Sequence, residues 1–261
     1  MDVLTYIFIA FTGLFFGSFF NVLADRLSME RTILGRSMCE SCHHTLAWYD
    51  LIPLISFALV QGKCRYCKAT LSLNYPLSEL FTSAIFLLTY YFSLHTYWQQ
   101  PIHVVHLAVA GLLIVMFLSD MRYQIIPDEM QIALFLVSII RLYFLLEPRL
   151  SFIDFQPYVL GAVVTMLPLL LVFILSKGRG MGFGDVKYAV SMGLLLGMWN
   201  GLVGLYLAFV FGGIIGGLLL LLRKSKMKSK IAFGPFLFLA TYLMLFFEND
   251  IILLLSKLYR F

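Results

Sequence analysis

Two aspartates stand at the edges of apolar segments, where an ionisable side chain is costly and therefore indicates a function. Asp120 ends an apolar stretch in Phe-Leu-Ser-Asp120, and Asp185 follows a glycine-rich run in Gly-Met-Gly-Phe-Gly-Asp185. Two carboxyl groups on the same side of a membrane could act together in hydrolysis. One would take a proton from water, while its protonated partner would hydrogen-bond the carbonyl under attack.

The glycines before Asp185 favour close contact with another chain. Gly182 and Gly184 permit positive φ angles, so a substrate strand could lie against this turn and be positioned by it. The same residues also fit a structural role, because Asp185 would stand at the N-cap of a helix and Asp120 could simply end one. The spacing alone leaves both interpretations open.

Two further acids are candidates for positioning a substrate. Asp128 follows Pro127, a combination that is typical of an ordinary helix N-terminus, although Asp128 could also exchange roles with Asp120. Glu79 stands near the start of another apolar segment and could either support a helix N-terminus or line the site.

The four cysteines form two Cys-x-x-Cys pairs, Cys39 with Cys42 and Cys64 with Cys67. Four thiolates from two such pairs suit tetrahedral Zn²⁺, and a reducing cytosol disfavours a structural disulfide. The alternative is redox-active or merely buried thiols. A Zn²⁺ ion would also hold together a loop that has little core of its own.

These residues must be positioned by membrane helices, because 61% of the 261 residues are hydrophobic and only 13% are charged. Soluble domains are about half apolar and about a quarter charged. We predict an all-α polytopic membrane protein of about eight transmembrane helices, with a bilayer around it and no nucleic-acid partner. Alternatively, the sixth segment is re-entrant and seven segments span. The predicted segments are residues 5–24, 77–97, 102–119, 129–146, 157–175, 186–200, 202–222 and 231–247.

Most of the 19 Lys and Arg residues fall in alternate loops, which predicts that both termini lie outside the cell. Both Asp120 and Asp185 then lie at the cytoplasmic face of the inner (cytoplasmic) membrane. The predicted domains are a first transmembrane helix (1–24), a cytoplasmic zinc-binding insert (25–76) and a transmembrane aspartyl protease domain (77–261). Arg141 lies within a predicted segment and is expected to reach outward. His103 and His106 are expected at the outer interface.

Several ordered motifs resemble those of the type IV prepilin peptidase family. They cover nearly the whole chain. They are Gly17-Ser-Phe-Phe-Asn21 with Arg26, the two cysteine pairs, Trp48–Ser56, Tyr75-Pro76 with Glu79, Asp120 with Ile126-Pro127-Asp128, Gly180–Lys187 and Phe233-Gly-Pro235-Phe.

The resemblance implies an aspartyl endopeptidase of the Gly-x-Gly-Asp class, with Asp120 and Asp185 as the catalytic pair. Such an enzyme cuts the leader from prepilins or pseudopilins after a glycine, at the cytoplasmic face of the membrane. Relatives with four cysteines also methylate the new N-terminus, using S-adenosylmethionine as methyl donor, so the insert is expected to be associated with methyl transfer.

The sequence departs from the family pattern at two positions. Glu40 replaces the usual proline after the first cysteine, and Asn74 replaces an arginine before Tyr-Pro. Both changes concern the methyltransferase half, and no glycine-rich nucleotide motif marks a methyl-donor site. The alternative function is a non-enzymatic, zinc-bearing membrane scaffold or a proton-coupled transporter, against which the scarcity of polar residues within the segments counts.

Overall fold

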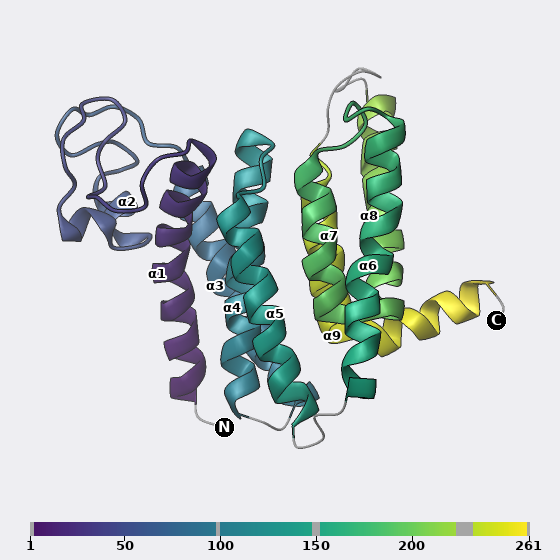
Figure 1. Ribbon diagram of the computed structural model, residues 1–261. Coiled ribbons are helices and arrows are strands. Elements are labelled where there is room, and N and C mark those ends of the chain that lie inside the picture. Colours follow the sequence, from purple (N-terminus) through teal and green to yellow (C-terminus); the bar gives the residue numbers. More distant parts are fainter. Residues whose placement is uncertain (1–2, 98–99, 148–151, 223–231, 260–261) are drawn as a thin grey trace.

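The computed structural model describes residues 3–97, 100–147, 152–222 and 232–259, and its regular structure there is helical (Figure 1). Two isolated β-bridges occur in the insert, and no strand is formed in the described ranges. The predicted all-α membrane fold is thus confirmed. The helices are α1 (Val3–Ser28), η1 (Trp48–Leu51), α2 (Ile55–Leu59), α3 (Asn74–Thr96), α4 (Gln100–Tyr123), α5 (Asp128–Leu146), α6 (Phe152–Leu175), α7 (Phe183–Leu196), α8 (Met198–Leu221) and α9 (Gly234–Tyr259).

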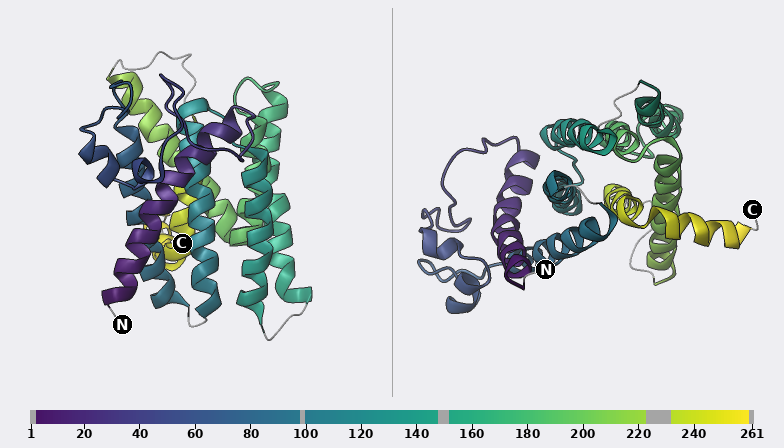
Figure 2. Two further views of the ribbon diagram at one scale, coloured as in Figure 1. Left: turned by 90° about the vertical axis from the view of Figure 1, so that its left-hand side faces the viewer. Right: turned by 90° about the horizontal axis from the view of Figure 1, so that it is seen from below.

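The eight long helices form one bundle in which successive helices run in opposite directions (Figure 1). The insert lies between α1 and α3, at what we call the insert end of the bundle, and sits beside α1 rather than over the bundle's centre (Figure 2). Helix α9 kinks at Phe247, where the predicted last segment also ends, and its final part points away from the bundle.

Among the described residues, seven helices are long and apolar enough to cross a membrane. Helix α7, the sixth predicted segment, has 14 residues. At 1.5 Å per residue it is about 21 Å long, shorter than the roughly 30 Å of a bilayer core. It also ends earlier than predicted. Gly197, with a φ of 83°, separates α7 from α8, whereas the sequence analysis placed this break near Gly201.

Helix α4 is the central element of the bundle. Its side chains belong to both apolar cores of the described chain: Val109, Leu113 and Met116 pack among α5 to α9, whereas Ile114 and Val115 pack against α1 and α3. Because α4 is buried on nearly all sides, the position of Asp120 at its end is fixed by both halves of the bundle.

Helices α6 and α7 cross at a very short distance. A Cβ atom added to Gly161 of α6 would lie 2.5 Å from the backbone oxygen of Gly193 in α7. Nearby, the hydroxyl of Thr165 donates hydrogen bonds of 2.7 Å to the backbone oxygens of Gly161 and Ala189. Small residues and interhelical hydrogen bonds are the usual means by which membrane helices associate.

The far end of the bundle contains a buried polar cluster, and here the expectation for Arg141 was wrong. Arg141 is 5% exposed and donates to the carbonyl oxygen of Leu195 at 2.9 Å, to Nε2 of His106 at 3.1 Å and to the hydroxyl of Tyr97 at 3.0 Å. It therefore does not reach outward, because it has partners on three other segments. His103 and His106 are buried in the same cluster, and the hydroxyl of Ser93 forms a hydrogen bond with each ring.

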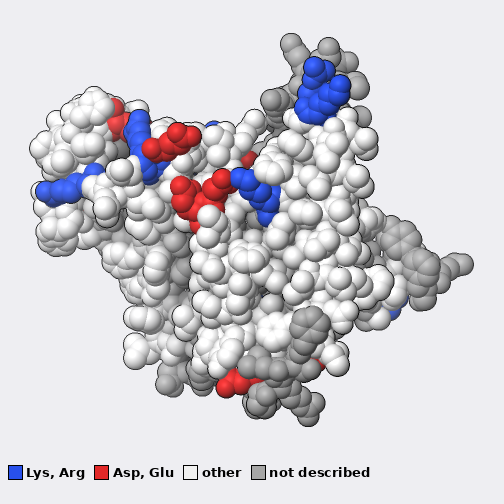
Figure 3. Space-filling model, viewed as in Figure 1, with Lys and Arg blue, Asp and Glu red and all other residues white. Residues whose placement is uncertain are grey.

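The distribution of charge fits a membrane-embedded bundle. On the face shown in Figure 3, charged side chains gather near the insert end, and a broad band without Lys, Arg, Asp or Glu covers the middle. The basic run at 223–230, Arg149 and Arg260 lie outside the described residues. The chain is a multi-pass membrane protein, and its orientation across the membrane remains a prediction from the loop charges.

The α6–α7 crossing makes a prediction about stability. We expect Gly161→Ala to lower the free energy of unfolding by about 1–3 kcal/mol, because the new methyl group would overlap a backbone atom of α7. Gly213→Ala in α8 is the matched control. It has nothing within 4 Å, so the same change should be neutral or stabilise by up to about 1 kcal/mol. Thermal unfolding in detergent measures both, and a Gly161→Ala protein as stable as wild type would contradict the packing.

Candidate active site

The structure brings Asp120 and Asp185 together at the insert end of the bundle. Asp120 lies in the last turn of α4 and Asp185 in the first turn of α7, and their side chains are close enough to interact electrostatically. Both residues are buried, with exposed fractions of 5% and 7%. Neither takes part in an ion pair with any basic side chain of the described chain.

The local backbone around Asp185 differs from expectation. The N-cap of α7 is Gly182, so Asp185 is the third residue of the helix rather than its cap. The Gly182 N–H faces the Asp185 carboxyl, which is the usual partnership of an acidic side chain at this position. Gly182 has a φ of −74°, and Gly184 is likewise absent from the residues with positive φ, so neither glycine adopts the left-handed conformation that it permits.

Asp120 is held by Gly234, whose motif Phe233-Gly-Pro235-Phe gave no indication of this role. The backbone N–H of Gly234, at the start of α9, points to the Asp120 carboxyl. A Cβ atom at Gly234 would lie 2.5 Å from Oδ2 of Asp120, so only glycine allows this approach. Two helix N-termini, those of α7 and α9, therefore meet the two carboxyl groups, and such termini favour negative charge.

Oδ2 of Asp120 is buried and has no hydrogen-bond partner among the described residues. A buried polar atom is normally paired, so an unpaired one indicates a ligand, a water molecule or a proton shared with a neighbour. Two buried carboxyl groups that lie near each other cannot easily both be ionised, and a closely spaced pair retains one proton. The arrangement can therefore offer one acid and one base to the same reacting group.

A polar brace fixes the end of α4 that carries Asp120. Arg122 donates to Oδ1 of Asp25 in α1 at 2.8 Å and also bonds Asn21, which exchanges hydrogen bonds with Ser78 of α3. The hydroxyl of Tyr123 donates to Asp25 as well, at 3.0 Å. Helices α1, α3 and α4 are thus tied together within one turn of Asp120.

Asp128 is not part of the carboxyl pair in this structure. It begins α5, as predicted from its position after Pro127. Both of its carboxylate oxygens accept hydrogen bonds from Nζ of Lys187 in α7, at 2.8 and 2.7 Å. This ion pair joins α5 to α7 two residues beyond Asp185.

Glu79 lies between the insert and the bundle. Its Oε2 accepts a hydrogen bond of 2.9 Å from the backbone N–H of Leu54, a residue with a φ of 60°, and its carboxyl also bonds Ser18 of α1. These contacts assign Glu79 to holding the insert against α1 and α3, while contact with a substrate remains only a prediction.

The four cysteines form one cluster on the insert, with their sulfur atoms all within 4.8 Å of one another. The two pairs have the same backbone design. Each cysteine pair is enclosed by an isolated β-bridge, the first between Met38 and Thr45 and the second between Lys63 and Thr70. In both pairs, the residue after the second cysteine has a positive φ. All four are free thiols. The cluster could bind a metal ion.

The surroundings of Cys39 favour metal binding. The backbone N–H groups of Cys42 and Ser41 lower the pKa of the Cys39 thiol to about 7. A larger fraction of thiolate is then present near neutral pH, and the thiolate is the form that binds metal.

Comparison with known proteins agrees with this geometry. Residues 11–93 match the family model described as the bacterial peptidase A24 N-terminal domain, and residues 107–217 match that of the type IV leader peptidase family. A Pseudomonas aeruginosa protein named prepilin leader peptidase/N-methyltransferase is 32% identical, over 92% of this chain and 89% of its own. Two further proteins of the same name are similar. The one from Myxococcus xanthus is 31% identical, over 84% of this chain and 64% of its own, and the one from Klebsiella pneumoniae is 32% identical, over 75% of this chain and 86% of its own. No solved structure matches.

The Asp128–Lys187 pair makes a prediction about stability. Its side chains are 62% and 41% exposed, so the pair should contribute no more than about 1 kcal/mol, and Asp128→Asn should lower the free energy of unfolding by that amount or less. Exchanging the two residues (Asp128→Lys with Lys187→Asp) should restore most of the loss. Chemical denaturation in detergent measures this, and a loss several times larger would show that Asp128 has another structural role.

Proposed function

Because the chain belongs to the type IV leader peptidase family, we propose that it is a membrane aspartyl endopeptidase that removes the leader of type IV prepilins or pseudopilins. Cleavage follows a glycine at the cytoplasmic face of the inner membrane, and Asp120 and Asp185 perform it. The observation that carries the proposal is the meeting of two buried carboxyl groups, one with an unpaired oxygen, from helices remote in the sequence.

The chemistry follows from the pair. The ionised carboxyl takes a proton from a water molecule, which attacks the carbonyl carbon of the scissile peptide bond. The protonated carboxyl hydrogen-bonds the carbonyl oxygen and later gives a proton to the leaving amine. Because the two groups titrate as a unit, neither role is assigned to one residue. The amides of Gly182 and Gly234 hold the carboxyls in place.

The loop charges support the orientation of the site. The predicted topology places the insert end, and hence both aspartates, on the cytoplasmic side. The exposed carboxylate of Asp128 also lies at this end, where the basic leader of a prepilin would arrive. The transporter alternative is weaker, because it leaves the convergence of the pair at one surface unexplained.

The names of the relatives support a second activity: methylation of the new N-terminal amine, with S-adenosylmethionine as methyl donor. The four-cysteine insert is the part of the chain associated with it through the family pattern. We assign no residue to the methyl donor and derive no step through it.

We further propose that the cysteine cluster binds a structural Zn²⁺ ion. With Zn–S distances of about 2.3 Å, a tetrahedral site has S–S edges of about 3.8 Å. The sulfur atoms of Cys39 and Cys67, one from each pair, are 3.8 Å apart. The ion would join the two halves of the insert, a segment in which the described regular structure is limited to η1 and α2.

The catalytic pair is tested by substitution. We expect Asp120→Asn and Asp185→Asn each to abolish cleavage of a prepilin-like peptide, because an amide can neither take nor give the proton. The matched control is Asp154→Asn in the first turn of α6, which should cleave normally. Mass spectrometry of the products measures cleavage, and thermal unfolding confirms that each variant is folded. Near-normal cleavage by either folded variant would overturn the pair.

The zinc site is tested by metal analysis. The purified protein should contain about one Zn per chain, and Cys39→Ser or Cys64→Ser should remove it, because the remaining three thiolates no longer close the site. Ser41→Ala, between the first two cysteines, is the control and should retain the metal. A folded, active protein without any bound metal would show that the cysteines have another role.

A further inference from the structure

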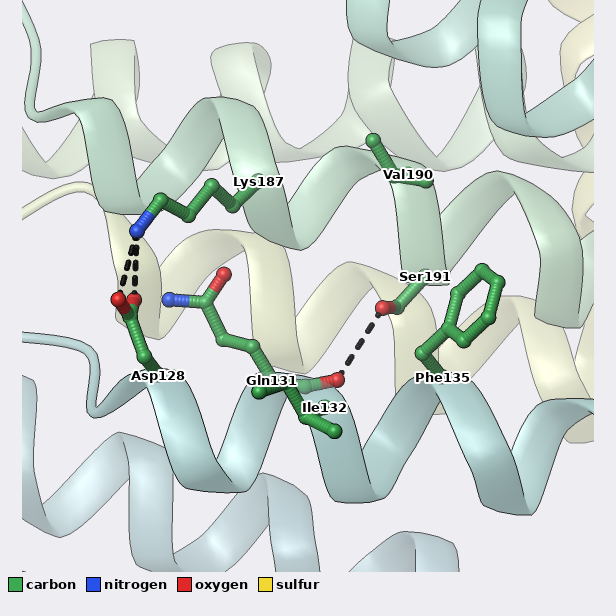
Figure 4. A pocket seen from close by; sticks show the side chains of 7 residues that line it. All are labelled: Asp128, Gln131, Ile132, Phe135, Lys187, Val190 and Ser191. Carbon is green, nitrogen blue, oxygen red and sulfur yellow. Dashed lines mark hydrogen bonds and ion pairs between the residues drawn. The ribbon is translucent and has the colours of Figure 1, made fainter.

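A groove opens between α5 and α7 on the side of the bundle (Figure 4). It has a volume of about 330 Å³. The ion pair of Asp128 and Lys187 stands at one end, and the remaining walls come from both helices. The lining residues are Asp128, Gln131, Ile132 and Phe135 of α5 and Lys187, Val190 and Ser191 of α7. Ile132 is 61% exposed, so the groove opens toward the lipid-facing surface.

Gln131 supplies an unpaired acceptor in this groove. Its side chain is 5% exposed, and its Nε2 donates a hydrogen bond of 3.1 Å to the backbone oxygen of Ile126. This bond fixes the carboxamide plane, yet Oε1 of the same group is buried and has no partner among the described residues. A buried acceptor left unpaired is destabilising, so its retention indicates a ligand that pairs with it.

The groove begins at the same level along the helix axes as the carboxyl pair, although neither Asp120 nor Asp185 lines it. Ile126, which holds the Gln131 amide, also packs on Gly184: a Cβ atom there would lie 3.4 Å from the Cβ of Ile126. Gly184 immediately precedes Asp185. Lys187, at the mouth of the groove, is two residues beyond Asp185, or about 3 Å along the helix axis, and points from the opposite face of α7. From this point the groove runs on the side of the bundle along α5 and α7, toward the midpoint of their length.

A peptide substrate of such a site has a specific requirement. A scissile bond can be attacked only when its helix has opened, which leaves backbone N–H and C=O groups unpaired. Inside a bilayer there is no water to pair them, and each unpaired group costs several kcal/mol. The enzyme must therefore offer fixed hydrogen-bond partners and apolar walls next to the catalytic groups.

We propose that the α5–α7 groove binds the apolar segment that follows the scissile bond, and that Oε1 of Gln131 accepts a hydrogen bond from a backbone N–H of that segment. Phe135 and Ile132 pack against its side chains. This inference rests on the proposed peptidase function and assigns a substrate-binding residue to it.

Photo-crosslinking tests the groove. A benzophenone amino acid is placed at Phe135 in the Asp185→Asn background, which keeps a prepilin substrate intact, and the control places it at Leu171 of α6, a lipid-facing position that is 56% exposed. We expect the substrate to crosslink at position 135 and not at 171, with the attachment point just after the scissile glycine. No adduct at 135, or equal adducts at both positions, would overturn the proposal.

Kinetics test Gln131 itself. Gln131→Met keeps the length of the side chain and removes the acceptor, so KM should rise about three- to tenfold with kcat changed less than twofold, the effect of one lost hydrogen bond. The control is Ser138→Ala on the same helix, whose hydroxyl is already paired with the Leu134 carbonyl; its KM should not change. An unchanged KM in Gln131→Met would refute the role of Gln131. Failure of the wild-type protein to cleave would instead refute the peptidase function.

Discussion

The burial of two carboxyl groups near each other is the constraint on which the rest of this structure depends. Neither Asp120 nor Asp185 has a basic partner in the described chain, so their environment must tolerate charge by other means. It does so with backbone N–H groups at the N-termini of α7 and α9, which supply positive potential without a competing cation. This solution requires α4 and α9 to approach closely, since Gly234 leaves no room for a single methyl group.

Other parts of the fold preserve that meeting point. The crossing of α6 and α7 at Gly161 and Gly193 fixes the sideways position of α7, and Arg141 binds the carbonyl of Leu195 near its far end. Both contacts hold the C-terminal end of the short α7, remote from Asp185. The ion pair at Lys187 adds a weak contact to α5 that is close to the site and leaves the adjoining groove open to lipid.

The insert is organised by different forces. It has no extended secondary structure in the described residues, and its geometry comes from two matched cysteine turns and from the Glu79–Leu54 hydrogen bond to the bundle. A bound metal would therefore affect the shape of the insert far more than that of the bundle. The structure also separates the two candidate sites, because the carboxyl pair lies between bundle helices and the cysteine cluster lies on the insert.

The sequence predicted the features that depend on local composition. Long apolar runs indicated the helices, and the cysteine spacing indicated one cluster. It could not predict features that depend on distant partners. Both Gly197 and Gly201 could have ended α7, and only packing against Thr165 shows that Gly201 belongs inside α8. Arg141 finds its partners on three other segments, and Gly234 approaches Asp120 across 114 positions of the chain. Nothing local to either residue reveals these contacts.

The central claim is that the two carboxyl groups act on one peptide bond. The most direct measurement is a cryo-electron microscopy structure of the protein in lipid nanodiscs with an uncleavable prepilin peptide bound. The account predicts that the carboxyl groups of Asp120 and Asp185 flank the scissile carbonyl, each within about 3 Å of it or joined to it through one water molecule. A peptide bound elsewhere, or packed side chains between the two aspartates, would contradict it.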